Sequence, residues 1–445
     1  MADIDTGVSC SGWVRDIIGY RWLVLFVAWV GWFGSTPSAA VAQTKTYQTG
    51  SMLYLDTGVA KIGVDVSWGG AITDLEKGTA SYVNRRDKGR EVQFALWDGN
   101  ATYDSCGGCT GTFGWNPVQA GDRYNHPSTV LSSSIANNTV YTKTQPLEWY
   151  PDNKGGGSGK AVADTDVTIE QWITAVPNVP QAFRIHYKTT YSGSAVHGGV
   201  CQEFPAVYAN GAYQSLVYYG GDAPWTGGQL TTVSPLPEES AGGIAIHASE
   251  RWAALVNTSG NGLTVYAPAA MPYASVFGHA GSGTGPSDDA TYYFRLCTSA
   301  INPPSTVQQG DAFLIAGAYP DARTIISNLR ATYPPAVAAT GYIASPPNNQ
   351  TLRGALPIVG WAIGSNPLST INVLIDHRKV LSITADTVPL SEVQAAWPRA
   401  PPNSGFQGML DTTTITNGTH ILILQAVDSQ GNTILFGARS IAVLN

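Results

Sequence analysis

Charged side chains are scarce in this sequence, and basic ones are the minority among them. Only 12% of the 445 residues are charged, with 24 lysines and arginines against 31 aspartates and glutamates, which gives a formal net charge of −7. Binding to nucleic acid depends on a basic patch that attracts phosphates. The composition therefore argues against a nucleic-acid partner.

Long apolar runs are missing beyond the N-terminal region. The run Trp22–Phe33 is shorter than the roughly 20 residues that span a membrane comfortably. Two arginines precede it and the small residues Ala40–Ala42 follow it, which is typical of a cleaved export signal. We expect residues 1–42 to be a signal peptide, and the mature protein to be secreted, periplasmic or on the cell surface without a membrane span. The acidic residues of the leading segment leave an uncleaved anchor open as the alternative.

Cysteine is also rare. Of five cysteines, Cys10 would leave with the signal, and the remaining four are an even number that suits an oxidising compartment. A zinc site at Cys106 and Cys109 would need further soft ligands, and the sequence has no second C-x-x-C pair. We expect a local disulfide between these two residues and a long-range one between Cys201 and Cys297.

Several well-known site signatures are absent. The sequence contains no nucleophile elbow, phosphate loop or dinucleotide fingerprint. His197 and His279 lie in glycine-rich segments with no acidic residue at metal-ligand spacing. We therefore expect no metal and no cofactor, and the oligomeric state stays open.

Glycine and proline are abundant instead, at 49 and 27 residues, and runs of helix-forming residues are few. This composition predicts an all-β fold of short strands joined by turns. Apolar and polar residues alternate in Ala60–Val66 and Gln181–Lys188, as in half-buried strands. In the second segment Arg184, His186 and Lys188 share one face, which is either solvated or a basic floor for an acidic sugar. Further strands are predicted at Gly243–His247, Trp252–Val256, Leu263–Tyr266, Thr291–Cys297 and Ala312–Ala316.

A helix and a linker divide the chain. Asp321–Arg330 has an acidic start and helix-spaced apolar residues, and it ends before two prolines. Pro334–Thr340 has the composition of a linker. Because the chain is long for one core, we expect a large β domain over residues 43–335 and a smaller β-sandwich over residues 341–445.

The residues after the linker contain a series of distinctive short segments, namely Gly360–Ala362, Val373–Asp376, Pro402–Phe406, Leu410–Thr413, Asn417–His420 and Ala426–Asp428. In the order and spacing of these segments, this part of the chain resembles the immunoglobulin-like modules appended to many secreted bacterial proteins. Their strand density suits such a sandwich, and Ile371–Val380 is predicted to be a hairpin that turns at its charged residues. His377 departs from the pattern, because these modules usually have glycine there, so a different turn type is expected. The resemblance implies a spacer or adhesion unit without catalysis.

The large domain has a glycine-rich turn in Val66–Leu75 and further distinctive segments at Asn84–Gln93, Trp115–Pro117 and Gln202–Tyr208. Val66–Leu75 looks like the first hairpin of galactose-mutarotase-like β-supersandwich proteins, and the other segments are similar to secreted bacterial proteins of this broad type. The resemblance implies a large β-supersandwich, followed here by a small immunoglobulin-like β-sandwich, with a concave sheet face that meets carbohydrate. The same fold supports several reactions. The paired histidines of aldose epimerases are not evident, which counts against mutarotation.

A polar, charged and aromatic stretch from Asn84 to Ser128 gives the main functional signal. Such a concentration in a chain with few charges indicates a surface for a polar ligand with flat apolar faces, as sugars have. Glycosidic-bond chemistry needs a proton donor and often a second carboxylate. Glu203, flanked by aromatic and proline residues, is the candidate general acid because apolar neighbours favour a protonated carboxyl group. The alternative is a strand-edge carboxylate paired with an arginine.

Two further segments hold candidate site residues, the charged turn before Gln93 and the loop from Trp115 to His126. Asp87 and Arg90 lie in a charged turn before Gln93, and alternation places Glu91 and Gln93 on one face and Arg90 on the other. The alternative is a solvated turn with an Asp–Arg pair. The candidate catalytic residues are Glu203, Asp87, Asp122 and His126. The candidate substrate-binding residues are Arg90, Gln93, Trp115, Asn116, Gln119, Tyr124 and Tyr208, with Trp115 and Tyr124 as stacking rings. The alternative for Trp115 is a ring that caps the core.

These residues support three functions. The first is an exported carbohydrate-active enzyme that cleaves glycosidic bonds of a polysaccharide. As a hydrolase it would use Glu203 with Asp87 or Asp122. As a lyase it would need a base such as His126 or Tyr124 and a cation such as Arg90. The second is a non-catalytic glycan-binding or adhesion protein, and the third is a structural envelope component in which the Asn84–Ser128 stretch is an interface.

Overall fold

The computed structural model describes most of the chain after the N-terminal segment. The described residues are 43–98, 115–151, 165–238, 243–279, 281–302 and 306–445, with only the backbone of residues 198–201 and 299–302. The predicted signal peptide and the Cys106–Cys109 pair lie outside them. In the described residues no helix is long and apolar enough to cross a membrane.

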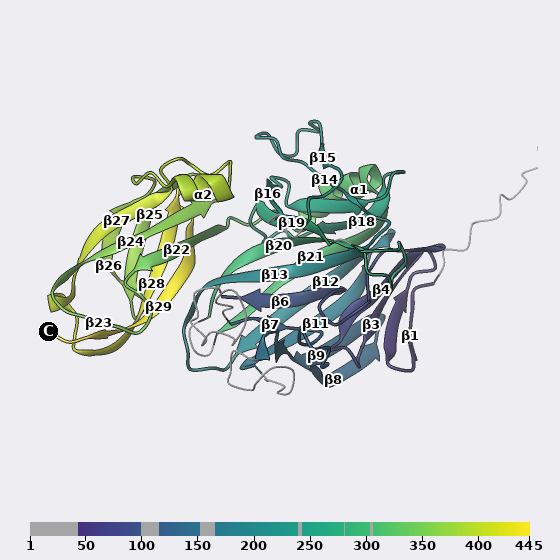
Figure 1. Ribbon diagram of the computed structural model, residues 1–445, viewed down its shortest axis with the longest axis horizontal. Helices are drawn as coiled ribbons and strands as arrows, with labels where there is room; N and C mark the ends of the chain where they lie inside the picture. Colours follow the sequence, from purple (N-terminus) through teal and green to yellow (C-terminus); the bar gives the residue numbers. More distant parts are fainter. Residues whose placement is uncertain (1–42, 99–114, 152–164, 239–242, 280, 303–305) are drawn as a thin grey trace, which may run out of the picture. The chain divides into compact units, whose positions relative to one another are not determined.

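Two antiparallel sheets make up residues 43–318 (Figure 1). Among the described residues, the larger sheet contains β1 (Lys45–Thr49), β2 (Met52–Asp56), β3 (Ala60–Asp65), β4 (Ala71–Lys77), β5 (Ala80–Ser81), β6 (Val92–Trp97), β7 (Pro117–Val118), β10 (Leu147–Glu148), β13 (His197–Asn210), β16 (Ile244–His247), β19 (Tyr273–His279) and β20 (Thr291–Asn302). The second sheet contains β8 (Thr129–Ala136), β9 (Thr139–Gln145), β11 (Val167–Val176), β12 (Val179–Tyr191), β14 (Ser215–Tyr218), β15 (Thr231–Val233), β17 (Trp252–Val256), β18 (Asn261–Tyr266) and β21 (Val307–Ala318).

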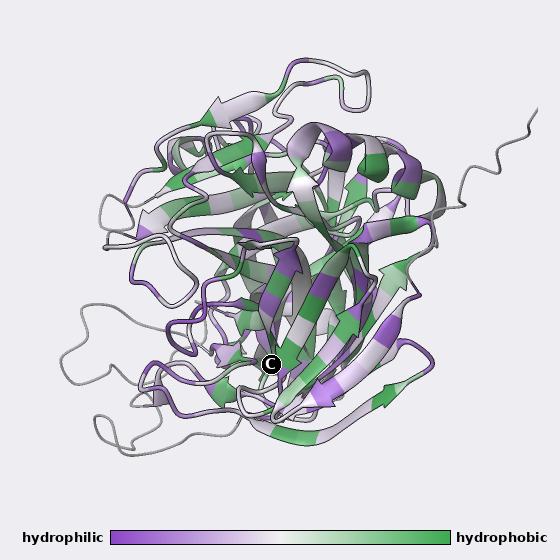
Figure 2. Cartoon of the chain, turned by 90° about the vertical axis from the view of Figure 1, so that its right-hand side faces the viewer, coloured by the Kyte–Doolittle hydropathy of each residue, from purple (hydrophilic) through white to green (hydrophobic). Residues whose placement is uncertain are grey.

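The two sheets pack face to face around one apolar core. Phe94 and Phe294 of the larger sheet and Ile173 and Leu314 of the second sheet belong to the same buried cluster. The sheets pack in this way because hydrophobic and hydrophilic residues alternate along the strands, as Figure 2 shows, and successive side chains point to opposite faces. The prediction of an all-β sandwich fold is confirmed, and each strand predicted above coincides with a strand of the structure.

One long helix covers part of the second sheet. Helix α1 (Tyr319–Thr332) begins with a proline in its first turn and packs Ala322, Ile326 and Leu329 against β18 and β21. The predicted helix at residues 321–330 is therefore confirmed.

Residues 339–443 form two smaller sheets with a core of their own. One contains β22 (Ala339–Ser345), β24 (Ala355–Gly364) and β27 (Gly405–Asp411); the other contains β23 (Gln350–Leu352), β25 (Leu368–Ile375), β26 (Arg378–Thr384), β28 (Gly418–Asp428) and β29 (Thr433–Val443), with α2 (Ser391–Ala396) and the short η3 (Thr412–Thr414) between strands. The predicted hairpin is β25–β26. Asp376 and His377 form its two-residue turn, both at positive φ (47° and 67°), as a type I′ turn requires. Independent folding of residues 43–335 and 341–445 stays a prediction.

The carboxylate of Asp428 is the hydrogen-bond acceptor at the end of β28. It accepts from the side-chain amides of Asn366 and Asn432 and from the backbone amides of Gln430 and Asn432. These hydrogen bonds, that of Asn366 first, lower the pKa of Asp428 from 3.8 to about 2. A carboxyl group whose pKa is lower in the folded state than in the unfolded state stabilises the folded protein at pH values above its unfolded-state pKa. This stabilisation is lost as the pH falls through the folded-state pKa.

We expect Asp428→Asn to lower the thermal unfolding temperature at pH 7, because the amide cannot accept four donors as a carboxylate does. The difference from wild type should shrink between pH 3.8 and about 2, where the wild-type carboxylate becomes protonated. Thermal unfolding followed by circular dichroism across this range tests the prediction. A difference that is the same at pH 7 and pH 2 would contradict it.

Candidate functional site

A pocket of about 500 Å³ lies on the outer face of the larger sheet. Strands β6, β13, β20 and β19 are neighbours in that sheet and form its floor. Residues two apart on a strand share a face, so Ser275, Phe277 and His279 of β19 line the pocket together. On β20, Thr291, Tyr293 and Arg295 do the same. The intervening residue Phe294 points the other way, into the core.

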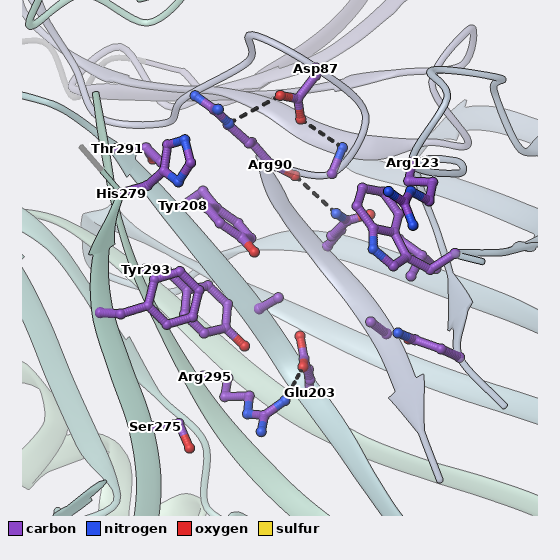
Figure 3. Close-up of a pocket in the computed structure, with 18 of the residues that line it drawn as sticks. Asp87, Arg90, Arg123, Glu203, Tyr208, Ser275, His279, Thr291, Tyr293 and Arg295 are labelled. Atoms are coloured by element: carbon purple, nitrogen blue, oxygen red, sulfur yellow. Dashed lines mark hydrogen bonds and ion pairs between the residues drawn. The ribbon is translucent and has the colours of Figure 1, made fainter. Parts of the chain in front are cut away.

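An ion pair between Glu203 and Arg295 lies on this floor (Figure 3). Arg295 Nη1 donates to Glu203 Oε1 at 2.6 Å, and the two side chains are 23% and 13% exposed. The pair forms because Ala206 of β13 is the cross-strand partner of Arg295, and a bulge between Glu203 and Ala206 shifts the register. Glu203 therefore has the arginine partner of the alternative prediction, although β13 lies between β6 and β20 and is not an edge strand. Its role as a general acid stays a prediction.

Aromatic rings stand beside the ion pair. Tyr208 and Tyr293 are cross-strand partners with ring centroids 4.6 Å apart, and Phe277 lies 4.4 Å from Tyr293 on the other side. Burial raises the pKa of the Tyr293 phenol well above its usual value. Tyr293 is therefore a protonated hydrogen-bond donor at neutral pH.

The charged turn before β6 forms one wall. Arg90 contacts Asp87 Oδ2 at 3.1 Å and Asp289 Oδ1 at 3.3 Å, and it donates to the Asp289 backbone carbonyl at 2.7 Å. Asp87 also accepts from the Gly89 backbone amide. Gln93 lines the pocket as well, with its amide donating to the carbonyl of Arg90 and accepting from the backbone of Ala120.

The predicted alternation of Arg90, Glu91 and Gln93 is wrong. Both Arg90 and Gln93 line the pocket, and Glu91 is fully buried. Glu91 has a φ of 76°, so the backbone is not extended there and the two-residue period begins only with β6. Burial raises the pKa of the Glu91 carboxyl well above its usual value. None of the described residues hydrogen-bonds to this carboxyl group.

Two of the predicted sugar contacts are wrong because their side chains are buried. Trp115 is 0% exposed, stacks on His197 at a centroid distance of 3.8 Å and donates to Asp166. Gln119 is also 0% exposed, accepting from the Phe94 backbone and donating to that of Gly70. A residue without exposed surface offers nothing to a sugar, so both belong to the packing of the loop.

Only some residues of the predicted catalytic loop line the pocket. Asp122 is 1% exposed and accepts hydrogen bonds from His126 Nδ1 at 2.7 Å and from the backbone amides of Tyr124 and His126. This pattern closes the loop. Asp122, Tyr124 and His126 do not line the pocket, whereas Arg123 and Asn125 of the same loop do.

The structure thus brings together six of the predicted residues and adds others. The predicted residues that line the pocket are Asp87, Arg90, Gln93, Asn116, Glu203 and Tyr208. The residues that sequence reasoning missed include Arg123, Trp149, Tyr150, His279, Tyr293 and Arg295. The sequence could have indicated Tyr293 and Arg295, because Thr291, Tyr293 and Arg295 are two residues apart in a predicted strand and therefore share one face. His279 is the last residue of β19 and His197 is the first residue of β13, so neither histidine lies in a glycine-rich loop as predicted.

Charge on the pocket lining is uneven. Three arginines line it against two carboxylates, while the whole chain is acidic. Arg123 lies over the ring of Tyr150 at 4.9 Å, which places a cation beside an aromatic face. Within the described residues no cluster of three His, Cys, Asp or Glu side chains has the arrangement of a metal site.

No protein-family model and no curated protein matches the sequence. Among solved structures, a protein described as an aldose 1-epimerase from Klebsiella pneumoniae aligns at 10% identity over 65% of this chain and 86% of its own, with a TM-score of 0.37. A polysaccharide lyase aligns at 10% identity over 90% and 47%, with a TM-score of 0.31. A 4-alpha-glucanotransferase from Thermococcus litoralis aligns at 10% identity over 62% and 39%, with a TM-score of 0.36. The chain spans less than half of the last two proteins. At such TM-scores the similarity carries no argument about activity.

Proposed function

We propose that this chain is an exported carbohydrate-active enzyme that cleaves glycosidic bonds of a polysaccharide in the pocket on the larger sheet. The observation that carries the proposal is the composition of the pocket, where aromatic rings and charged side chains converge on one floor. Pockets with a few convergent polar groups among apolar surfaces are the usual ligand sites of proteins. Tyr208, Phe277 and Trp149 offer flat apolar faces, and the arginines and carboxylates offer partners for hydroxyl and acidic groups.

The ion pairs favour elimination over hydrolysis. The general acid of a hydrolase must donate a proton to the leaving oxygen. Both carboxylates of the pocket instead accept hydrogen bonds from guanidinium groups, Glu203 from Arg295 and Asp87 from Arg90. A guanidinium has five N–H donors, so Arg295 keeps others for the carboxylate of a uronate sugar.

Elimination from a uronate needs a base, a proton donor and a cation. Tyr208, whose ring stands beside the Glu203–Arg295 pair, would as a phenolate take the proton from the carbon next to the sugar carboxylate, whose charge Arg295 neutralises. The electron pair of that C–H bond then forms a carbon–carbon double bond, and the bond to the glycosidic oxygen breaks. The Tyr208 hydroxyl would then donate this proton to the leaving oxygen. The products are a new chain end with a hydroxyl group and an unsaturated uronate.

A glycan panel tests this proposal. Purified mature protein is incubated with acidic polymers (polygalacturonate, alginate, hyaluronan) and neutral ones (mannan, starch), and both reducing ends and ultraviolet absorbance are measured. We expect new reducing ends and new ultraviolet absorbance in parallel on an acidic polymer, because elimination leaves a conjugated double bond. Reducing ends without absorbance would show hydrolysis. Absence of any product from the whole panel would refute the proposal that the protein cleaves glycosidic bonds.

The second candidate is a non-catalytic glycan-binding protein. The ion pairs of Glu203 and Asp87 also favour this function, because neither carboxylate is placed to act as an acid. In the panel experiment this function predicts binding without product. Glycan binding that survives Glu203→Gln, with no turnover by either protein, would support it.

A further inference from the structure

A second aromatic and charged surface lies on the other sheet, on the face turned away from the core. In the second sheet, Tyr141 of β9, Trp172 of β11, His186 of β12 and Asp311 of β21 are cross-strand partners in one row. Partners in an antiparallel pair point to the same side of the sheet. Because Ile173, the neighbour of Trp172, belongs to the core, the row lies on the outer face.

Helix α1 covers only one part of this outer face. Phe313 of β21 is the cross-strand partner of Arg184 and packs in one cluster with Ile326 of the helix. His186 and Asp311, which belong to the row, lie two residues from Arg184 and Phe313 on the same two strands. The side chains of Trp172 and His186 are only half-buried. We call the surface formed by Tyr141, Trp172, His186 and the charged residues beside them the outer platform.

The rings of the outer platform are held in place by neighbouring polar groups. Trp172 has Tyr141 at a centroid distance of 5.1 Å on one side and His186 at 5.5 Å on the other. The Tyr141 hydroxyl donates to Glu170 at 2.9 Å, and His186 Nδ1 contacts Asp311 at 2.9 Å. Rings fixed in this way lose little conformational entropy when a ligand stacks on them.

A shallow cavity of about 280 Å³ opens at the two outer rings. Tyr141 and Trp172 form its aromatic side, and the small residues Ser134, Ala136 and Thr139 form the rest. Small side chains on β8 and β9 therefore leave space beside the rings. The volume lies near the lower end of ligand sites, which begin at about 300 Å³, and suits a single sugar ring.

Charge on the outer platform is cationic although the chain is acidic. Arg184 forms a two-point ion pair with Asp311, and Lys188 pairs with Glu170 at 3.0 Å. Lys143, the cross-strand partner of Glu170, has no ion pair with any residue that the structure describes. One positive charge is thus left uncompensated next to the rings, which suits an anionic ligand.

We propose that the outer platform is a second glycan-binding site, which holds an acidic polysaccharide by stacking a sugar ring on Trp172 and Tyr141 and by attracting its acidic group to Lys143. The site is separate from the pocket, because it lies on the other sheet. The inference does not depend on cleavage in that pocket. A site of this kind would keep the polymer attached to the protein.

Electrophoresis in native gels that contain polygalacturonate, alginate or hyaluronan tests the outer platform. Trp172→Ala is the main variant, and Tyr47→Ala is its matched control. Tyr47 is a half-buried ring of β1 that stacks with Tyr54 on the outer face of the other sheet, because Leu53 and Leu55 on either side of Tyr54 belong to the core. We expect at least one acidic polymer to retard wild type, Trp172→Ala to bind that polymer at least tenfold more weakly, and Tyr47→Ala to bind as wild type does. Lys143→Glu should weaken retardation by the acidic polymer, and in matching gels that contain mannan instead it should leave any retardation unchanged.

Two further measurements separate the outer platform from the pocket and from a protein interface. Cleavage of a short oligosaccharide by Trp172→Ala should equal that of wild type, and Arg295→Ala should lose less of the retardation by the acidic polymer than Trp172→Ala does. Equal retardation of Trp172→Ala and wild type, or no retardation of wild type by any of the three polymers, would overturn the proposal. Loss of retardation in Arg295→Ala alone would overturn it too, because binding would then reside in the pocket. A change of mass in light scattering of Trp172→Ala, with retardation unchanged, would identify an interface between protein chains instead.

Discussion

Replacing Arg295 with alanine should slow glycan cleavage about 100- to 1000-fold, the range found when one positioned donor to a developing negative charge is removed. Arg295 lines the pocket floor and contacts Glu203 at 2.6 Å. In elimination its guanidinium neutralises the sugar carboxylate, which makes the neighbouring proton acidic enough for a base to remove. The loss should fall mainly on kcat, because the negative charge grows in the transition state.

Glu203→Gln is the matched control for this prediction. If Glu203 only holds Arg295 in place, the glutamine variant should retain cleavage within about tenfold, because its side-chain oxygen can still accept from the guanidinium. If Glu203 is the general acid of a hydrolase, the same variant should lose about 100- to 10,000-fold. Initial rates of both variants on the polymer that the panel identifies, with thermal unfolding as a check of folding, decide between them. A larger loss in Glu203→Gln than in Arg295→Ala would rule out elimination.

Replacing Arg323 with alanine should lower the free energy of unfolding by about 3–5 kcal/mol, the range for removing one partner of a buried ion pair. Glu250 is 1% exposed and accepts from Arg323 Nη2 at 2.8 Å and Nε at 3.1 Å. It also accepts from Trp252 Nε1 and from the backbone amide of Trp225, both at 2.8 Å. Without the guanidinium, the carboxylate stays buried without an opposite charge.

Two controls make the Arg323 prediction sharp. Arg330→Ala removes an exposed arginine of the same helix that lies over the ring of Trp225 at 4.7 Å, and it should cost at most about 1 kcal/mol. The double variant Arg323→Met with Glu250→Gln removes both charges and should cost less than Arg323→Ala. Urea unfolding of the three variants measures these differences. Equal costs for Arg323→Ala and Arg330→Ala would contradict the buried ion pair.

Local patterns in the sequence predicted the elements of the fold. Alternation in Ala60–Val66 and Gln181–Lys188 is a property of neighbouring residues, and it determines which side chains face a core. Helix α1 followed from the spacing of Ile325, Ile326 and Leu329 and from the prolines after it. The hairpin of β25 and β26 followed from two strand patterns separated by charged residues.

The candidate site was predicted less well, and the reasons are physical. Trp115 and Gln119 occur in a polar stretch and are nevertheless fully buried, because burial depends on what packs over a loop. Glu91 departs from the strand period because its backbone has a positive φ. The alternating pattern of Tyr141, Trp172 and His186 was visible on separate strands, but their alignment in one row required the strand order.

The residue pattern alone specifies β-strands in sandwiches, since hydrophobic alternation decides locally which face of each strand is buried. It also indicated a surface rich in charges and rings. Which of these groups meet depends on how the strands are arranged in the folded chain. Glu203 and Arg295 are 92 residues apart in the chain and form an ion pair because β13 and β20 are neighbours in the sheet. Strand order is set by the packing of the whole chain, and no local pattern encodes it.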